Sequence, residues 1–179
     1  MFKVVRRLLV FLIIIILAVA YYKNVYQPRQ QAKSRAQVTA PVEKTITVIE
    51  GWNNKQVDNY LKEQGLKLDQ KLSDYKVSDW RDDYAFLTDA PARASLEGYL
   101  FPDTYRIFAS STAEEITRKM LSNFDSKLTP EMLQEIQRQK KTLPQIVTMA
   151  SIVEKEVTSV ADMKIVAGIF WDKIKNGQA

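Results

Sequence analysis

An apolar run near the N-terminus constrains this chain more than any other feature. Residues 8–22 read LLVFLIIIILAVAYY, carry no charge, and follow Lys3, Arg6 and Arg7. A membrane-spanning helix needs about 20 residues, and the two valines before the arginines, with snorkelling arginine side chains, supply the missing length. The pattern predicts a transmembrane anchor over residues 1–22 whose N-terminus stays in the cytoplasm, because flanking cations remain inside.

The same run also fits a cleavable signal peptide. Residues 18–20 read AVA, which matches the small-residue pattern of a cleavage site after Ala20. Two features favour the uncleaved anchor. The core holds four consecutive isoleucines, and Tyr21, Tyr22 and Tyr26 resemble an interfacial aromatic belt. Under either interpretation, the residues that follow leave the cytoplasm.

The composition excludes several kinds of chemistry. The 179 residues include no cysteine and no histidine, while 46% are hydrophobic and 26% charged, as in an ordinary globular protein. Thiolate zinc sites, cysteine nucleophiles, Ser-His-Asp triads and histidine acid–base catalysis are therefore excluded. The chain also has no calcium-loop motif. We therefore expect neither a metal site nor a cofactor.

The positive charge is concentrated near the apolar run. Of the 26 lysines and arginines, seven lie in residues 1–35, which contain no acidic residue, so the remainder carries 19 cations against 21 acidic side chains. The folded part is mildly acidic, and we expect no nucleic-acid partner. Residues 23–44 are polar and include Pro28 and Pro41, which is typical of a linker.

A small α/β unit is predicted over residues 45–90. Residues 45–49 alternate polar and apolar side chains like a strand, Asn53 or Asn54 can cap a helix, and Gly65 can end it. The predicted buried positions are Val57, Tyr60 and Leu61 on the helix, and Leu66 and Leu68 at the start of a second strand. A compact β-α-β unit of this size suits a binding or spacer module better than a catalytic one.

Residues 96–107 are rich in aromatic side chains. They read LEGYLFPDTYRI and combine rings with hydrogen-bonding groups, namely Glu97, Tyr99, Phe101, Asp103 and Tyr105. A saccharide groove needs this combination, because a sugar ring offers an apolar face for stacking and hydroxyls for polar contacts. A turn-rich core segment whose aromatics only pack would look the same. Both interpretations stay open on the residues alone.

Three helices are predicted after this segment. Residues 112–124 and 131–140 are amphipathic, and residues 143–157 read LPQIVTMASIVEKEV with Pro144 in the first turn, where its missing N–H costs nothing. The third helix has an apolar stripe made by Ile146, Ala150, Val153 and Val157. Together with the α/β unit, these helices predict an α+β protein.

Two glutamates border the apolar stripe of the third helix. Glu154 and Glu156 lie on opposite flanks of it, whereas Lys155 is expected to point away. Carboxylates beside an apolar face are either ordinary solvated charges or acids held in a cleft, where burial raises the pKa towards a proton-donating role. The helix by itself favours the solvated charges.

The two motifs together resemble the endolytic murein transglycosylase family, also called YceG-like. LEGYLFPDTY is followed about forty residues later by VTMASIVEKE, behind one N-terminal anchor. TVIEGW with the helix after it looks like the family's LysM-like subdomain, and VAGIFWDKIKNG at residues 166–177 looks like the helix after the catalytic one. The resemblance implies a LysM-like subdomain over residues 45–90 and the N-terminal part of a helix-rich catalytic domain over residues 91–179.

The resemblance also implies an activity. Such enzymes cleave the β-1,4 bond between N-acetylmuramic acid and N-acetylglucosamine within peptidoglycan strands and leave 1,6-anhydro ends. We therefore expect a single-pass protein of the bacterial cytoplasmic membrane with its catalytic domain outside. The expected partners are glycan strands, membrane lipid and peptidoglycan synthases, and the expected role is to terminate the elongation of nascent strands.

The resemblance assigns residues to this chemistry. By its position in the motif Glu154 is the catalytic acid, and Glu97 orients the saccharide or supports Glu154. The remaining candidates for support or substrate binding are Tyr99, Phe101, Asp103, Tyr105, Ser151 and Glu156, with Ser151 placed one turn before Glu154 to hydrogen-bond it.

One departure from the family pattern accompanies the resemblance. Family members continue beyond the Asn-Gly at residues 176–177 with further substrate-contacting turns, so a truncated catalytic domain, exposed at Glu154 and inactive by itself, is expected here. A different class of function also stays open. A non-catalytic envelope scaffold would bind peptidoglycan through the LysM-like unit and use the Glu154 helix only for packing.

Overall fold

The structure, a computed structural model, describes residues 19–26 and 42–178. The chain divides into two units, Met1–Val42 and Glu43–Ala179, which are considered separately. In the first unit a helical turn leads into the π-helix η1, Tyr22–Tyr26. Within the described residues, no helix has the length and apolar character needed to cross a bilayer. Most of the predicted anchor and of the predicted linker lies outside the described residues.

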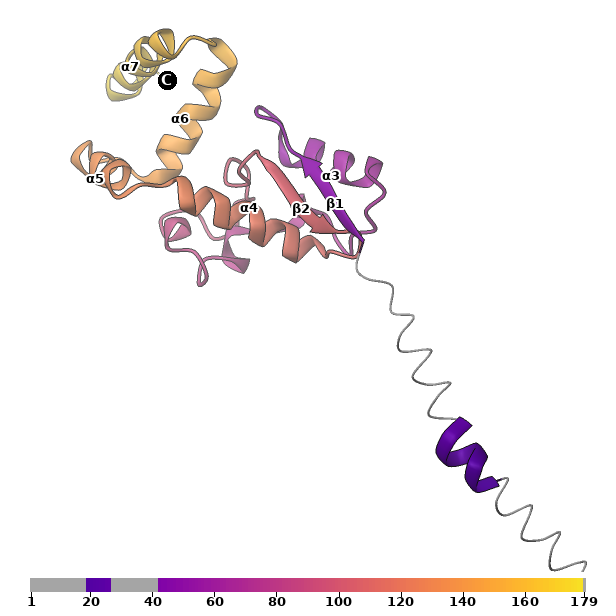
Figure 1. Ribbon diagram of the computed structural model, residues 1–179. Coiled ribbons are helices and arrows are strands. Elements are labelled where there is room, and N and C mark those ends of the chain that lie inside the picture. The colour runs from indigo at the N-terminus through magenta and orange to yellow at the C-terminus, as the bar shows by residue number, and fades with distance from the viewer. Residues whose placement is uncertain (1–18, 27–41, 179) are drawn as a thin grey trace, which may run out of the picture. The chain divides into compact units, whose positions relative to one another are not determined.

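The second unit is built on a two-stranded antiparallel sheet (Figure 1). Strand β1, Glu43–Thr47, pairs with β2, Thr104–Phe108, in a register that places Ile46 opposite Tyr105. Both side chains are buried, as expected for directly opposed residues on the inner face of a sheet.

The second predicted strand is a correction. The segment at Leu66 and Leu68 has no strand partner, and β1 pairs instead with residues from the aromatic segment. Leu66 is buried in the core without joining a ladder, so its spacing with Leu68 indicated burial and not pairing. The β-α-β unit is therefore not completed within residues 45–90. The sheet crosses the predicted boundary at residue 90.

Helix α3, Asn54–Glu63, begins and ends where the sequence indicates. Asn53 caps it reciprocally with Gln56, since each side-chain oxygen accepts from the other residue's backbone N–H. At its C-terminus Gly65 adopts φ +75°, and the N–H groups of Gly65 and Leu66 bond back to the last turn. This is a Schellman ending, which relieves the last carbonyls of the helix.

Three short 3₁₀ helices connect α3 to the aromatic segment: η2 at Leu72–Asp74, η3 at Val77–Asp79 and η4 at Ala85–Leu87. Asp58 on α3 accepts hydrogen bonds from the backbone N–H groups of Leu72 and Ser73 and so ties η2 to the helix. Trp80, in the turn after η3, is buried at 2% exposure.

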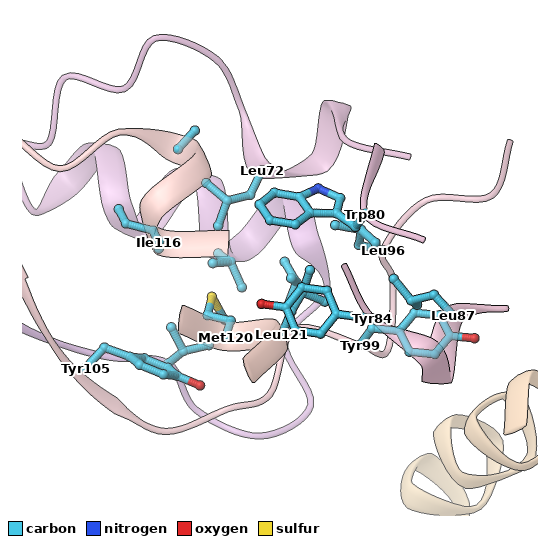
Figure 2. Packing of buried hydrophobic residues seen from close by; sticks show 14 of the residues in the cluster. Leu72, Trp80, Tyr84, Leu87, Leu96, Tyr99, Tyr105, Ile116, Met120 and Leu121 are labelled. Atoms are coloured by element: carbon cyan, nitrogen blue, oxygen red, sulfur yellow. The ribbon is translucent and has the colours of Figure 1, made fainter. Parts of the chain in front are cut away.

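Helix α4, Ala113–Lys127, supplies the other side of the core. Figure 2 shows Ile116, Met120 and Leu121 of α4 meeting Trp80 and Tyr105, which come from separate parts of the chain. Thr112 caps the helix, and the Asp69 carboxylate accepts a hydrogen bond from the Ala113 N–H at 3.0 Å. One hydrophobic core is therefore shared by the sheet, α3, the 3₁₀ helices and α4.

The chain ends in three helices with less burial. They are α5 at Pro130–Arg138, α6 at Leu143–Glu156 and α7 at Val160–Lys175 (Figure 1). Neither α5 nor α7 has a buried residue among those described, whereas α6 buries three side chains. The result is a helix-rich α+β unit with a small sheet, as the sequence predicts.

Candidate active site

Helix α6 positions the predicted catalytic residue. Gln145 accepts a hydrogen bond from the Thr142 backbone N–H at 3.0 Å, which closes the first turn. The buried side chains of α6 are Leu143, Met149 and Val153. The predicted stripe is therefore right at Val153 but wrong at Ala150, which is exposed while Met149 is buried. The helix packs with a face rotated from the predicted one, which leaves Ala150 on the surface of a groove.

A cleft of about 790 Å³ lies along α6. Three segments and one side chain of α4, Phe124, line it. The segments are the loop after β1 with the start of α3, the segment 97–102, and residues 147–155 of α6. Its ionisable lining residues are Glu97, Glu154 and Lys155. The structure thus brings together the two carboxylates that the sequence singles out from separate motifs. It also places Lys155 at the cleft, which the helical wheel did not predict.

Gly98 sets how closely the aromatic segment approaches α6. Its φ is +82°, and a β-carbon built at this position would lie 2.6 Å from Cγ1 of Val147. No side chain larger than hydrogen fits there unless the Val147 side chain or the helix that carries it shifts. The glycine of the LEGYLFPDTY motif therefore holds the segment that carries Glu97 against the helix that carries Glu154.

Hydrogen bonds fix the turn after Gly98. The Tyr105 hydroxyl donates to the Phe101 carbonyl at 2.6 Å, and Nδ2 of Asn123 on α4 donates to both Tyr105 and Asp103. The bond from Asn123, followed by one from the Thr104 N–H, lowers the pKa of the Asp103 carboxyl. Neither Asp103 nor Tyr105 lines the cleft. Their hydrogen bonds instead hold the turn that carries Phe101, which does line it.

The three aromatic candidates of this segment divide between core and cleft. Tyr99 and Tyr105 are buried, and burial raises the pKa of both phenols. Phe101 is half-buried and lines the cleft, with the Lys127 ammonium 5.4 Å from its ring centroid. Burial supports a scaffold role for the two tyrosines. Of the predicted groove aromatics, Phe101 remains available for contact with a ligand.

Glu97 is engaged at the first turn of α3. Its Oε2 accepts a hydrogen bond from the Asn54 backbone N–H at 3.1 Å, where the helix N-terminus favours negative charge. This bond occupies one carboxylate oxygen and links the aromatic segment to α3. The arrangement suits a residue that positions other groups.

Glu154 and Glu156 differ in their surroundings. Both are exposed, but Glu154 lines the cleft and Glu156 does not. Among the described residues, Glu154 accepts no hydrogen bond, so both carboxylate oxygens are free to meet a ligand. Ser151 also lines the cleft, but its hydroxyl donates to the Thr148 carbonyl at 2.8 Å and not to Glu154.

Several cleft residues were not singled out by sequence reasoning. They are Trp52, Asn54, Thr148, Lys155 and Phe124 of α4, with Asn123 behind the cleft. Their positions depend on the approach of α3 and α4 to α6, which no local pattern encodes. The sequence did contain one signal, the tryptophan directly after Gly51 in TVIEGW.

Comparison with known proteins places the chain in a family. The YceG-like family matches residues 21–179, which is most of the chain. The chain therefore belongs to the YceG-like family. The 2.6 Å crystal structure of a yceG-like protein from Listeria monocytogenes is similar to it, with a TM-score of 0.58 and 25% identity over 86% of this chain and 53% of that one.

Two curated relatives carry a more specific name. The endolytic murein transglycosylase of Streptococcus pneumoniae serotype 2 strain D39 is 41% identical over 86 residues, which are 48% of this chain and 15% of that protein. The endolytic murein transglycosylase of Bacillus subtilis strain 168 is 35% identical over 81 residues, 45% of this chain and 22% of that protein. The matched part is thus less than a quarter of either relative.

Proposed function

We propose that this chain belongs to an endolytic murein transglycosylase that cleaves the bond between N-acetylmuramic acid and N-acetylglucosamine within peptidoglycan strands. The names of the curated relatives and the family support this activity. The observation that carries it is the cleft, where Glu154 stands beside aromatic and hydrogen-bonding side chains and Glu97 lies in the same lining.

One carboxylate suffices for this chemistry. Ordinary glycosidases use two carboxylates, one of which activates water or attacks the sugar. In a transglycosylase Glu154 protonates the glycosidic oxygen as the bond from C1 to that oxygen breaks. The 6-hydroxyl oxygen of the same muramic residue then bonds to C1 and returns its proton to Glu154. No water is consumed, and the carboxyl is restored.

The other candidates position this reaction. Glu97, fixed by the first turn of α3, orients the saccharide or supports Glu154, and Phe101 offers a ring for stacking. Ser151 supplies a hydroxyl on the cleft wall. The turn after Gly98 is held by Tyr99, Asp103 and Tyr105. Glu156 is assigned no contact with substrate.

The proposed setting is the bacterial cell envelope. Residues 1–22 anchor the protein in the cytoplasmic membrane and the unit from residue 43 lies outside, where nascent strands are accessible and peptidoglycan synthases are nearby. Cleavage there terminates the elongation of a strand. The apolar run and its flanking cations support this placement.

The products of sacculus digestion test the activity. We expect the protein as its own cell makes it to release muropeptides with 1,6-anhydro ends, each lighter by one water than the corresponding reducing end in a mass spectrum. Reducing ends would instead indicate a hydrolase. Binding to sacculi without any cleavage would support the scaffold alternative.

A further inference from the structure

Trp52 lines the cleft that contains Glu154, in the loop between β1 and α3. It is half-buried, whereas the structural Trp80 is buried at 2% exposure. Part of the Trp52 side chain packs against the hydrophobic core, and the rest stays accessible. Trp52 therefore presents apolar ring surface in a cleft whose lining also carries two phenylalanines, Phe101 and Phe124, together with carboxylates, amides and hydroxyls.

The Trp52 ring is held in place before any ligand arrives. It packs against Tyr60 of α3 with ring centroids 5.2 Å apart, and the Tyr60 hydroxyl accepts a hydrogen bond from the Thr47 backbone N–H at 3.0 Å. Gly51, at φ +79°, allows the turn that brings the ring back over the helix. A preformed aromatic surface of this kind loses little conformational entropy on binding.

Three amide side chains line the same cleft as the ring. The side-chain oxygens of Asn53 and Gln56 are occupied by the cap of α3, so their NH₂ groups stay available at the cleft. Asn54 is 4% exposed, and its Nδ2 has no hydrogen-bond partner among the described residues. A buried donor without a partner is unfavourable and is relieved by an acceptor on a ligand.

We propose that Trp52 and the amides of Asn53, Asn54 and Gln56 form a subsite for a 2-acetamido sugar. The sugar ring stacks on the indole, and the acetamido carbonyl, an acceptor, meets the NH₂ donors. This inference rests on the proposed function and extends it. It also makes the segment predicted as a separate glycan-binding module one wall of the catalytic cleft.

Calorimetric titration with tetra-N-acetylchitotetraose tests the subsite. All variants carry Glu154→Gln, so that no turnover accompanies binding. Trp52→Leu, which keeps apolar volume but removes the ring, is expected to weaken binding roughly tenfold. Trp52→Phe keeps a stacking ring and is expected to lose roughly threefold or less. The matched control is Phe108→Leu, because it also replaces an aromatic ring by leucine, but Phe108 is exposed on β2 and lies outside this cleft.

The outcomes separate the subsite from the activity. Equal affinity of Trp52→Leu and the parent, with a native circular dichroism spectrum, overturns the subsite, and so does a parent that does not bind the tetrasaccharide. A ring-dependent affinity, together with no anhydro ends from the protein that retains Glu154, leaves the subsite standing and overturns the proposed reaction. Anhydro ends together with ring-independent affinity overturn the subsite and leave the proposed reaction standing.

Discussion

At the scale of single residues, Gly98 determines the geometry of the candidate site. Its positive φ suits glycine, and its contact with Val147 leaves no room for a β-carbon. Gly51 also has a positive φ, but a β-carbon there would meet nothing within 4 Å. The two glycines therefore separate the cost of backbone conformation from the cost of a steric clash.

Substituting alanine at the two glycines should give unequal losses of stability. Gly51→Ala should lower the free energy of unfolding by about 1 kcal/mol, the cost of a left-handed conformation. Gly98→Ala should lower it by about 2–4 kcal/mol, because a clash with α6 is added. Urea unfolding of both variants measures the difference.

A double mutant isolates the clash at Gly98. Val147→Ala removes the methyl group that the new β-carbon would meet, so it should recover part of the loss in Gly98→Ala. Equal losses in the two glycine variants, or no recovery in the double mutant, would contradict the close contact between this segment and α6.

At the scale of elements, the ends of the helices carry much of the local information. Three N-caps, Asn53, Thr112 and Thr129, accept hydrogen bonds from backbone N–H groups in the first turns of α3, α4 and α5. The end of α5 is less favourable. Lys140 adopts φ 54° while its N–H and that of Lys141 complete a Schellman ending, a conformation that glycine adopts more easily.

Replacing Lys140 by glycine should stabilise the protein. The variant removes left-handed strain but makes the unfolded chain more flexible, so we expect a net gain of roughly 0.5–1 kcal/mol. Differential scanning calorimetry should show a higher Tm. Lys140→Ala serves as the control, because it removes the charge and keeps the strain. A similar Tm rise in both variants would assign the effect to charge.

Asp69 links α4 to the loop after α3 and makes this contact dependent on pH. The hydrogen bond from the Ala113 N–H is the main reason that the pKa of Asp69 lies below its ordinary value of 3.8. A carboxyl with a lowered pKa in the folded state adds stability above its unfolded pKa. That stability is lost as the pH falls through the folded value.

Asp69→Asn should therefore flatten the acid side of the stability profile. The amide oxygen can still accept from Ala113, but it carries no charge to interact with the α4 N-terminus. Tm measured from about pH 5 to about pH 3 should fall less steeply in the variant than in the parent. Parallel profiles would show that Asp69 contributes nothing to acid sensitivity.

At the scale of the whole molecule, the sequence predicted elements better than their assembly. Helices α3 to α6 and their caps follow from local spacing, because capping and amphipathic faces are properties of neighbouring residues. The pairing of β1 with β2 joins residues such as Thr47 and Thr104, which are 57 positions apart, and no local pattern indicates it. The predicted partner at Leu66 was therefore wrong.

The candidate site shows the same division. Spacing alone could not choose between Glu154 and Glu156, and family resemblance supplied the choice. The structure adds that Glu154 lines the cleft and Glu156 does not. Trp52, Asn54 and Phe124 reach the cleft through the packing of α3 and α4, so their roles could not be seen before the elements were assembled.

The central claim is that a single carboxylate, Glu154, performs the reaction. Its most direct test is the yield of 1,6-anhydro muropeptides from sacculi digested by the full protein and by two matched variants. We expect Glu154→Gln to lower the rate at least roughly 100-fold and Glu156→Gln to stay within roughly twofold of the parent. Normal yield from Glu154→Gln, or an equal loss in both variants, would contradict the assignment.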